Sequence, residues 1–240
     1  MSVKPYRDST ESKKRQVEQM FDNISEKYDF LNHSLSFNLD KYWRNRAIGM
    51  LKKDAPGWLL DVATGTGDMV KPALKLRPDK IVGLDLSEGM LQVARRKFPS
   101  VSDGTSIEFI KGDSEHLPFE DGTFDAVTVA FGVRNFEQPV LGLTEIHRVL
   151  NPGGRIVVLE FSKPRLFPFR QLYNFYFRNI LPFFGRMISK DSSAYTYLPE
   201  SVSRFPEREA FMELLQEAGF KNGYFKPLTL GVATLYTAIK

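Results

Sequence analysis

The sequence contains no cysteine, which excludes disulfide bonds, thiolate metal sites and cysteine nucleophiles. Its three histidines are far apart in the chain of 240 residues, so we expect no metal site. No apolar run approaches the roughly 20 residues needed to span a bilayer. The charged start, Met1 to Gln16, also lacks the apolar segment of a secretion signal. We therefore expect a cytoplasmic protein.

The most informative motif lacks a glycine. An apolar run from Leu59 to Ala63 leads into Gly65-Thr66-Gly67, but Asp68, Met69 and Val70 follow. Dinucleotide folds use a third glycine so that strand and helix can close over a pyrophosphate, so this sequence argues against NAD or FAD. Asp61 and Asp68, at the two ends of the motif, suit a ligand with an amine and a sulfonium, such as S-adenosylmethionine. The alternative is that both acids cap a helix.

Two further acids follow later apolar runs. Asp85 ends the run from Ile81 and lies 18 positions beyond Gly67. An acid about 20 residues after the glycines can accept hydrogen bonds from both hydroxyls of a ribose. Asp113, after Gly112, could accept a hydrogen bond from an adenine amino group. Each acid could instead cap a turn. The occurrence of two successive strand-turn-helix units with these residues at their strand ends favours nucleoside binding.

Short apolar runs alternate with helical patterns along most of the chain. The expected strands are Gly57 to Ala63, Lys80 to Asp85, Ile107 to Lys111, Phe124 to Ala130, Arg155 to Phe161, Tyr224 to Leu228 and Val232 to Ile239. The first five predict a doubly wound parallel sheet, and the last two an antiparallel hairpin. We therefore expect one α/β domain over residues 1–240, with a mostly parallel seven-stranded sheet and N-terminal helices over about residues 9–53.

Arg134 and Asn135 follow the fourth run, beside Gly132. Because ligands bind at the carboxyl ends of parallel strands, this pair faces the place where a methyl donor and an acceptor would meet. Glu160 and Ser162 end the fifth strand on the same rim. The alternative is a loop arginine that pairs with a neighbouring acid.

The segment from Phe161 to Lys190 contains no acid. It carries six cations, Lys163, Arg165, Arg170, Arg178, Arg186 and Lys190, and eight aromatic residues between them, Phe167, Phe169, Tyr173, Phe175, Tyr176, Phe177, Phe183 and Phe184. One interpretation is a cover over the active site, about residues 163–200, that rests on an anionic membrane. The alternatives are an inserted helix with a satellite core, or RNA stacking. No recognition motif accompanies the cations, so we expect no nucleic-acid partner.

Several motifs resemble the ubiquinone/menaquinone biosynthesis C-methyltransferases. They are Phe21-Asp22-Asn23-Ile24-Ser25, Tyr28-Asp29-Phe30-Leu31-Asn32, Ser36 with Trp43-Arg44, Phe131-Gly132-Val133-Arg134-Asn135, Arg148 to Gly154, Glu160-Phe161-Ser162, and Tyr195 to Ser201. They cover nearly the whole chain from Val17, and within the family they most resemble the demethylmenaquinone methyltransferases. The resemblance implies the Rossmann-like fold of class I S-adenosylmethionine-dependent methyltransferases.

The resemblance also implies a site. The expected donor-binding residues are Thr64, Gly65, Gly67, Asp85, Leu86, Asp113 and Ser114. The family often has glycine and histidine where this chain has Asn38 and Asp40, serine at Ala130 and lysine at Asn151. These differences remove one possible donor contact and put in doubt a histidine base at position 40.

The implied reaction is transfer of a methyl group to a ring carbon of a prenylated quinol, demethylmenaquinol, in menaquinone biosynthesis. Arg134 is expected to stabilise a developing phenolate, while Asn135 or Tyr195 orients the ring and Asp40, His33 or a water takes the proton. A lipid-soluble substrate favours the cover and a peripheral membrane location. A benzoquinol of the ubiquinone pathway, action in both pathways, or a non-catalytic scaffold remain alternatives, and a homo-oligomer stays open.

Overall fold

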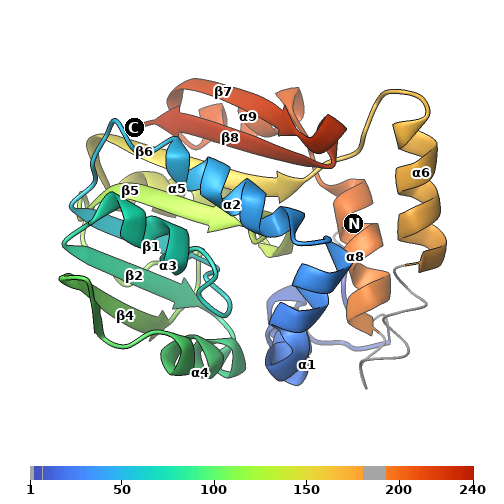
Figure 1. The fold of residues 1–240 in the computed structure, drawn as a ribbon, viewed down its shortest axis with the longest axis horizontal. Helices are drawn as coiled ribbons and strands as arrows, with labels where there is room; N and C mark the ends of the chain where they lie inside the picture. Colours follow the sequence, from blue (N-terminus) through green and yellow to red (C-terminus); the bar gives the residue numbers. More distant parts are fainter. Residues whose placement is uncertain (1–2, 7, 181–192) are drawn as a thin grey trace.

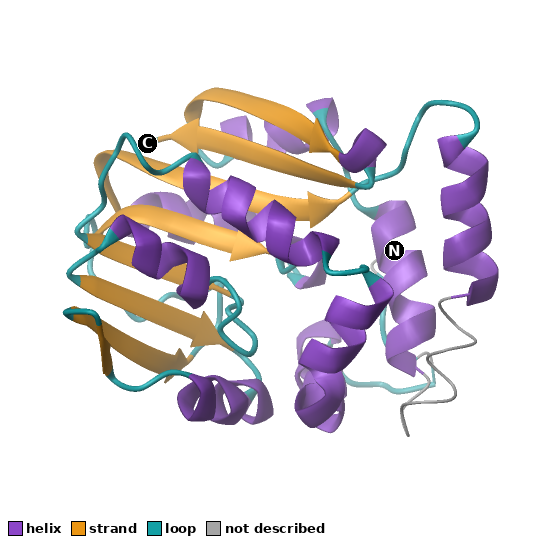
Figure 2. Ribbon diagram, in the orientation of Figure 1, coloured by secondary structure: helices purple, strands orange, loops and turns teal. Residues whose placement is uncertain are grey.

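An eight-stranded sheet organises the computed structural model, which describes residues 3–6, 8–180 and 193–240 (Figures 1 and 2). The strand order is β3-β4-β2-β1-β5-β6-β8-β7. The bounds are β1 Trp58–Val62, β2 Lys80–Asp85, β3 Val101–Ser102, β4 Thr105–Lys111, β5 Phe124–Ala130, β6 Leu150–Phe161, β7 Lys221–Leu228 and β8 Ala233–Ile239. Strands β4, β2, β1, β5 and β6 are parallel, and β8 and β7 are antiparallel. The expected fold class is confirmed.

The sheet has one strand more than the seven predicted. The additional strand, β3, has two residues and pairs antiparallel with β4 across Asp103-Gly104. Both turn residues have positive φ, 51° and 82° respectively, as a tight hairpin turn requires. Two residues are too few to show a period-2 pattern, which is why hydrophobic alternation did not reveal this strand.

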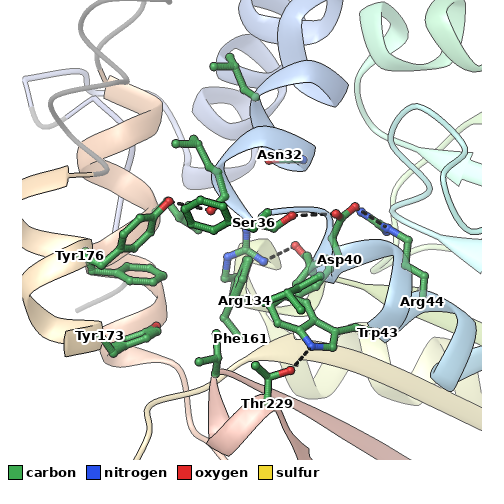
Figure 3. A pocket seen from close by; sticks show the side chains of 18 of the residues that line it. Asn32, Ser36, Asp40, Trp43, Arg44, Arg134, Phe161, Tyr173, Tyr176 and Thr229 are labelled. Atoms are coloured by element: carbon green, nitrogen blue, oxygen red, sulfur yellow. Dashed lines mark hydrogen bonds and ion pairs between the residues drawn. The ribbon is translucent and has the colours of Figure 1, made fainter. Parts of the chain in front are cut away.

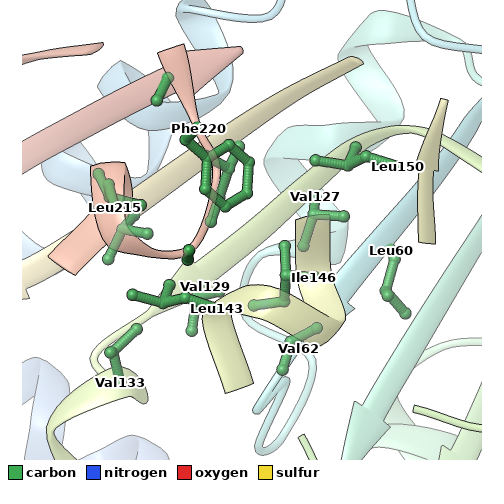
Figure 4. Packing of buried hydrophobic residues seen from close by; sticks show 14 of the residues in the cluster. Leu60, Val62, Val127, Val129, Val133, Leu143, Ile146, Leu150, Leu215 and Phe220 are labelled. Atoms are coloured by element: carbon green, nitrogen blue, oxygen red, sulfur yellow. The ribbon is translucent and has the colours of Figure 1, made fainter. Parts of the chain in front are cut away.

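Helices cover both faces of the sheet. Their bounds are α1 Lys13–Leu35, α2 Leu39–Gly49, α3 Val70–Ala73, η1 Leu74–Leu76, α4 Glu88–Lys97, η2 Val133–Asn135, α5 Pro139–Val149, α6 Phe169–Phe175, η3 Tyr176–Ile180, α8 Ser193–Arg204, α9 Glu209–Glu217 and η4 Thr229–Gly231. On one face, α5 and α9 pack against β1, β5 and β6, and Figure 4 shows Leu143 and Ile146 of α5 among the strand valines. On the other face, α2 and α3 pack through Trp43, Ala47 and Val70.

Helices α1, α6 and α8 lie beyond the carboxyl ends of the parallel strands (Figure 1). In Figure 1, α1, α8 and α6 stand beside that edge of the sheet. Ser12 caps α1, since its side chain accepts a hydrogen bond from the Arg15 amide, and Phe37 and Asn38 adopt positive φ where the chain turns into α2. Within the described residues, no helix is both long and apolar enough to cross a membrane. The edge where ligands bind in such sheets is thus enclosed by helices.

Candidate active site

A small pocket of about 80 Å³ lies at the ends of β2 and β4, under α1. Five of the predicted donor-binding residues line it, namely Gly65, Asp85, Leu86, Asp113 and Ser114. These residues come from three loops that follow neighbouring strands. The parallel order of the strands therefore brings them together, as the sequence spacing predicted.

Asp85 joins two of these loops. Its carboxylate accepts hydrogen bonds from the Gly65 amide at 2.7 Å and the Ser87 amide at 2.9 Å. Burial raises the pKa of Asp85 to about 6, although these backbone amides oppose the shift. Gly65 has φ +58° and nothing within 4 Å of the position that a Cβ would take, so its backbone faces open space. The pocket thus combines an acid with an approachable backbone, as ribose binding requires.

Thr64 and Gly67 lie in the same loop but do not line either of the two cavities described here. The Thr64 hydroxyl donates to Asp61 at 2.6 Å, and Thr128 donates to the other oxygen of Asp61 at 2.6 Å. Burial raises the pKa of Asp61 to about 6. Because Asp61 is 1% exposed and lines neither of the two cavities, it fixes the loop and does not reach the amine of a ligand.

Helix α1 is attached across these loops by polar contacts. In α1, Lys14 contacts Asp113 at 2.6 Å and Glu18 contacts Lys111 at 2.8 Å. Further along the helix, Asp22 accepts a hydrogen bond from Ser87 Oγ at 2.6 Å and Asp29 contacts Lys97 at 2.7 Å. Asp113 also accepts a hydrogen bond from the Glu115 amide at 2.9 Å. Asp113 thus both closes a turn and lines the pocket, so the two alternatives weighed for it are compatible.

A second, larger cavity of about 400 Å³ lies between α1, α2, α6 and η4 (Figure 3). Its lining is mainly aromatic and aliphatic and includes Phe21, Tyr28, Trp43, Phe131, Phe161, Tyr173, Tyr176 and Tyr197. Phe21, Tyr28 and Phe131 line the small pocket as well. The two cavities therefore share an aromatic wall, and ligands in them would approach each other there.

Arg134 lines the large cavity and is 7% exposed. Its Nη1 contacts Glu160 Oε1 at 2.7 Å and donates to the Phe131 carbonyl, while its guanidinium carbon lies 5.5 Å from the centre of the Phe161 ring. Glu160 is fully buried. The arginine thus faces the cavity and pairs with a neighbouring acid at the same time, which joins the two interpretations considered for it.

Asn135 lines the small pocket and accepts a hydrogen bond from the Tyr197 hydroxyl at 3.1 Å. Burial raises the pKa of Tyr197 to about 12, so its hydroxyl stays protonated. The predicted Tyr195 lies in α8, but its side chain falls outside the described residues. The contact made by Tyr197 was missed, although both tyrosines stand in the same motif.

Asp40, His33 and Asp68 form a polar network in which Asp40 is buried and the other two side chains are partly exposed. Asp40 accepts hydrogen bonds from His33 Nδ1 at 2.8 Å and Ser36 Oγ at 2.7 Å, and it lines the large cavity. His33 Nε2 lies 3.9 Å from Asp68 Oδ2. These three side chains could offer ligand atoms to an ion. However, Lys97 contacts Asp68 at 2.7 Å and Arg44 lies 3.7 Å from it, so cations of the protein already balance the carboxylates.

The small pocket has the chemistry that S-adenosylmethionine needs. Moving along the sheet from β4 to β2 to β1, the strand-end loops present Asp113, Asp85 and Gly65 in turn. The amino group of adenine and the hydroxyls of ribose donate hydrogen bonds, and carboxylates such as these can accept them. The residues present therefore fit the donor, with Asp113 suited to the adenine and Asp85 to the ribose.

Comparison with known proteins agrees with this geometry. The ubiE/COQ5 methyltransferase family model matches residues 9–240. The demethylmenaquinone methyltransferase of Bacteroides fragilis is 46% identical over 240 residues, covering 99% of this chain and 97% of that protein. The ubiquinone/menaquinone biosynthesis C-methyltransferase UbiE of Geotalea daltonii is 44% identical over 230 residues, covering 95% of this chain and 97% of that protein.

Solved structures share the fold. A possible histamine N-methyltransferase from Thermotoga maritima, described as S-adenosylmethionine-dependent, superposes with a TM-score of 0.62 at 19% identity, covering 92% of this chain and 99% of the other. The [4+2]-cyclase SpnF gives a TM-score of 0.63 at 20% identity, with 95% and 96% covered. The chain thus belongs to the ubiE/COQ5 methyltransferase family and is an S-adenosylmethionine-dependent methyltransferase, as its sequence predicted.

Proposed function

We propose that the protein transfers the methyl group of S-adenosylmethionine to a ring carbon of demethylmenaquinol, forming menaquinol. The large apolar cavity beside the donor pocket carries this proposal, because an aromatic lining suits a quinol ring with a prenyl tail. The two cavities share Phe21, Tyr28 and Phe131, so a ring bound in one would reach a donor bound in the other. Relatives named demethylmenaquinone methyltransferase, 46% and 45% identical, also favour this acceptor.

A quinol carbon beside a hydroxyl group is electron-rich, and it becomes more nucleophilic as the hydroxyl proton leaves. When bound, S-adenosylmethionine supplies a methyl group that its sulfonium has already activated. Overall, the ring carbon exchanges a hydrogen for a methyl group, the sulfonium becomes a thioether, and one proton is released. The tasks left to the protein are alignment of the ring and removal of the proton.

Three polar side chains are suited to hold the ring. Arg134 can stabilise negative charge on a ring oxygen, because its guanidinium faces the cavity and Glu160 fixes its position. Asn135, held by the Tyr197 hydroxyl, stands at the donor side of the shared wall. The buried Tyr173 hydroxyl, which also lines the large cavity, has no hydrogen-bond partner among the described residues and can bind the second ring oxygen.

Asp40 is the candidate proton acceptor. Its buried carboxylate lines the cavity, and it is hydrogen-bonded to His33, which does not line the cavity. His33 is about a quarter exposed, and in the tautomer whose Nδ1 carries no hydrogen it can take the proton from Asp40 and release one from Nε2 to solvent. Asp40→Asn should therefore lower kcat much more than it raises the KM for the quinol. Ser36→Ala, which removes the other hydrogen bond to Asp40, is the milder comparison.

We also propose that the cavity mouth meets an anionic membrane surface. Large apolar side chains are exposed around the mouth, including Phe37, Leu39, Phe169, Leu172 and Leu230, which also line the cavity. Phe167 is 80% exposed nearby in the sequence, and Arg165 and Arg170 are exposed on the same segment. An apolar rim with flanking cations is the pattern expected at a lipid interface, from which a prenylated substrate could enter.

The test is an anaerobic assay of the purified protein with S-adenosylmethionine, in which product is identified by mass. Reduced demethylmenaquinone and a reduced ubiquinone precursor are offered in parallel. Product from the naphthoquinol alone is the expected result, and product from both would indicate action in two pathways. Product from neither, with donor binding intact, would overturn the proposed acceptor and favour a scaffold role.

A further inference from the structure

Arg44 is a buried guanidinium that makes no hydrogen bond to any residue the structure describes. It is 7% exposed and lines the large cavity near Phe131, whose ring centre lies 5.3 Å from its guanidinium carbon (Figure 3). The nearest carboxylate oxygens belong to Asp40 at 3.6 Å and Asp68 at 3.7 Å, both too far for a hydrogen bond. These two ion pairs offset the charge of Arg44, but its donors make no hydrogen bond among the described residues, so a carboxylate at hydrogen-bonding distance would satisfy them.

Asp68 has the complementary deficiency. Its Oδ1 accepts a hydrogen bond from Lys97 at 2.7 Å, but its buried Oδ2 has no partner among the described residues, and neither does Arg44 Nε. Although burial opposes it, the nearby Arg44 and Lys97 cations lower the pKa of Asp68, which keeps the carboxylate ionised. Arg44 Nη2 and Asp68 Oδ2 thus form a long ion pair of 3.7 Å, in which neither Arg44 Nε nor Asp68 Oδ2 makes a hydrogen bond to a described residue.

Their position follows from the sheet topology. Asp113 follows β4 and Asp85 ends β2, and the next strand in the sheet, β1, leads into the loop that carries Asp68. Adenine, ribose and the amino-acid chain are joined in that order in S-adenosylmethionine. A donor with its adenine at Asp113 and its ribose at Asp85 therefore extends toward Asp68 and Arg44.

We propose that Arg44 binds the carboxylate, and Asp68 the ammonium, of the amino-acid end of S-adenosylmethionine. The zwitterion complements the two groups in charge, and a guanidinium can engage a carboxylate through two parallel hydrogen bonds. Helix α2 thus contributes directly to donor binding, although the donor motif lies between β1 and β2. The inference depends on the donor but not on the quinol, so it stands apart from the proposed acceptor.

Calorimetric binding of S-adenosylhomocysteine and of methylthioadenosine, which lacks the amino-acid end, tests this directly. Arg44→Met should weaken S-adenosylhomocysteine about 10- to 100-fold, as expected for loss of a charge-assisted hydrogen bond. The same substitution should change the affinity for methylthioadenosine by no more than about twofold. Asp68→Asn should behave in the same way. Arg46→Met, at an exposed position of the same helix, is the matched control and should change the affinity for neither ligand.

A decarboxylated analogue of S-adenosylhomocysteine that keeps the amine separates the two residues. Its affinity should fall with Asp68→Asn but not with Arg44→Met. The proposal is overturned if Arg44→Met leaves S-adenosylhomocysteine binding unchanged or weakens both nucleosides equally. Unchanged nucleoside binding with a raised quinol KM would assign Arg44 to the acceptor instead. If Arg44→Met does not fold, Arg44→Lys, which keeps the charge but loses the paired geometry, should still weaken S-adenosylhomocysteine selectively.

Discussion

Replacing Glu160 with glutamine should lower the free energy of unfolding by about 3–5 kcal/mol, the range typical when a buried ion pair loses one partner. The Glu160 carboxylate is fully buried and accepts hydrogen bonds from Arg134 Nη1 at 2.7 Å, the Arg134 amide at 3.2 Å and the Phe161 amide at 3.0 Å. Glutamine has nearly the same volume, so no cavity forms. The loss arises from leaving the Arg134 charge buried without its partner.

The assay is urea unfolding followed by circular dichroism, with thermal unfolding in parallel. For a chain of this size, 3 kcal/mol corresponds to a decrease in Tm of about 6–12 °C. Asp54→Asn is the control, because the Asp54–Arg155 pair is partly exposed and should contribute no more than about 1 kcal/mol. A Glu160→Gln protein within 1 kcal/mol of the wild type would refute the reasoning.

The double variant Arg134→Met, Glu160→Gln separates stability from catalysis. With both charges removed, no buried charge remains unpaired, and stability should return close to that of the wild type. Turnover should remain low because the cavity has lost its cation for the ring oxygen. Wild-type turnover in this variant would show that Arg134 is not needed for the reaction.

Three further predictions concern binding. Burial raises the pKa of Asp85 to about 6, so protonation of this hydroxyl acceptor should weaken S-adenosylhomocysteine by up to about tenfold from pH 7 to pH 5. Asp85→Asn should give weak binding that does not vary over that range. Asp113→Asn should weaken the binding of S-adenosylhomocysteine about tenfold. It should not weaken the binding of the inosine counterpart, which lacks the adenine amino group. Equal losses of affinity for the two ligands would exclude the adenine contact. Phe37→Ser with Phe167→Ser should reduce sedimentation with anionic vesicles at least about tenfold, and unchanged sedimentation would exclude the proposed membrane face.

The sheet and the positions of Asp85 and Asp113 at the small pocket could be predicted because each depends on local pattern. Apolar runs that end in Asp85 or just before Asp113 place those acids at strand ends, and parallel strands bring such ends together. The pairing of Arg134 with Glu160 depends instead on side-chain direction at the ends of two neighbouring strands. The sequence indicated that both residues lie at the carboxyl-end edge of the sheet. It did not indicate whether the arginine side chain would face solvent, the cavity or the acid.

Helix contributions were harder to foresee. The helical spacing of Val17, Met20 and Ile24 indicated an amphipathic helix, but its polar contacts with the strand-end loops depend on how the helix crosses the sheet edge. Likewise, Arg44 stands in α2 among other charged residues, and nothing local shows that its side chain is buried. Tyr197 and Tyr195 could not be ranked, because the rotation of α8 decides which side chain meets Asn135.

The shared wall of Phe21, Tyr28 and Phe131 separates two cavities that are built from different elements of the fold. Most of the small pocket is made by loops of the sheet, whereas the large cavity is made largely by α1, α2, α6, η3 and α8. Acceptor range can therefore change by substitution or exchange of those helices while the strand-end loops keep their sequence. A chimera carrying residues 163–204 of a relative with another quinone nucleus should inherit the new ring preference together with an unaltered affinity for the nucleoside.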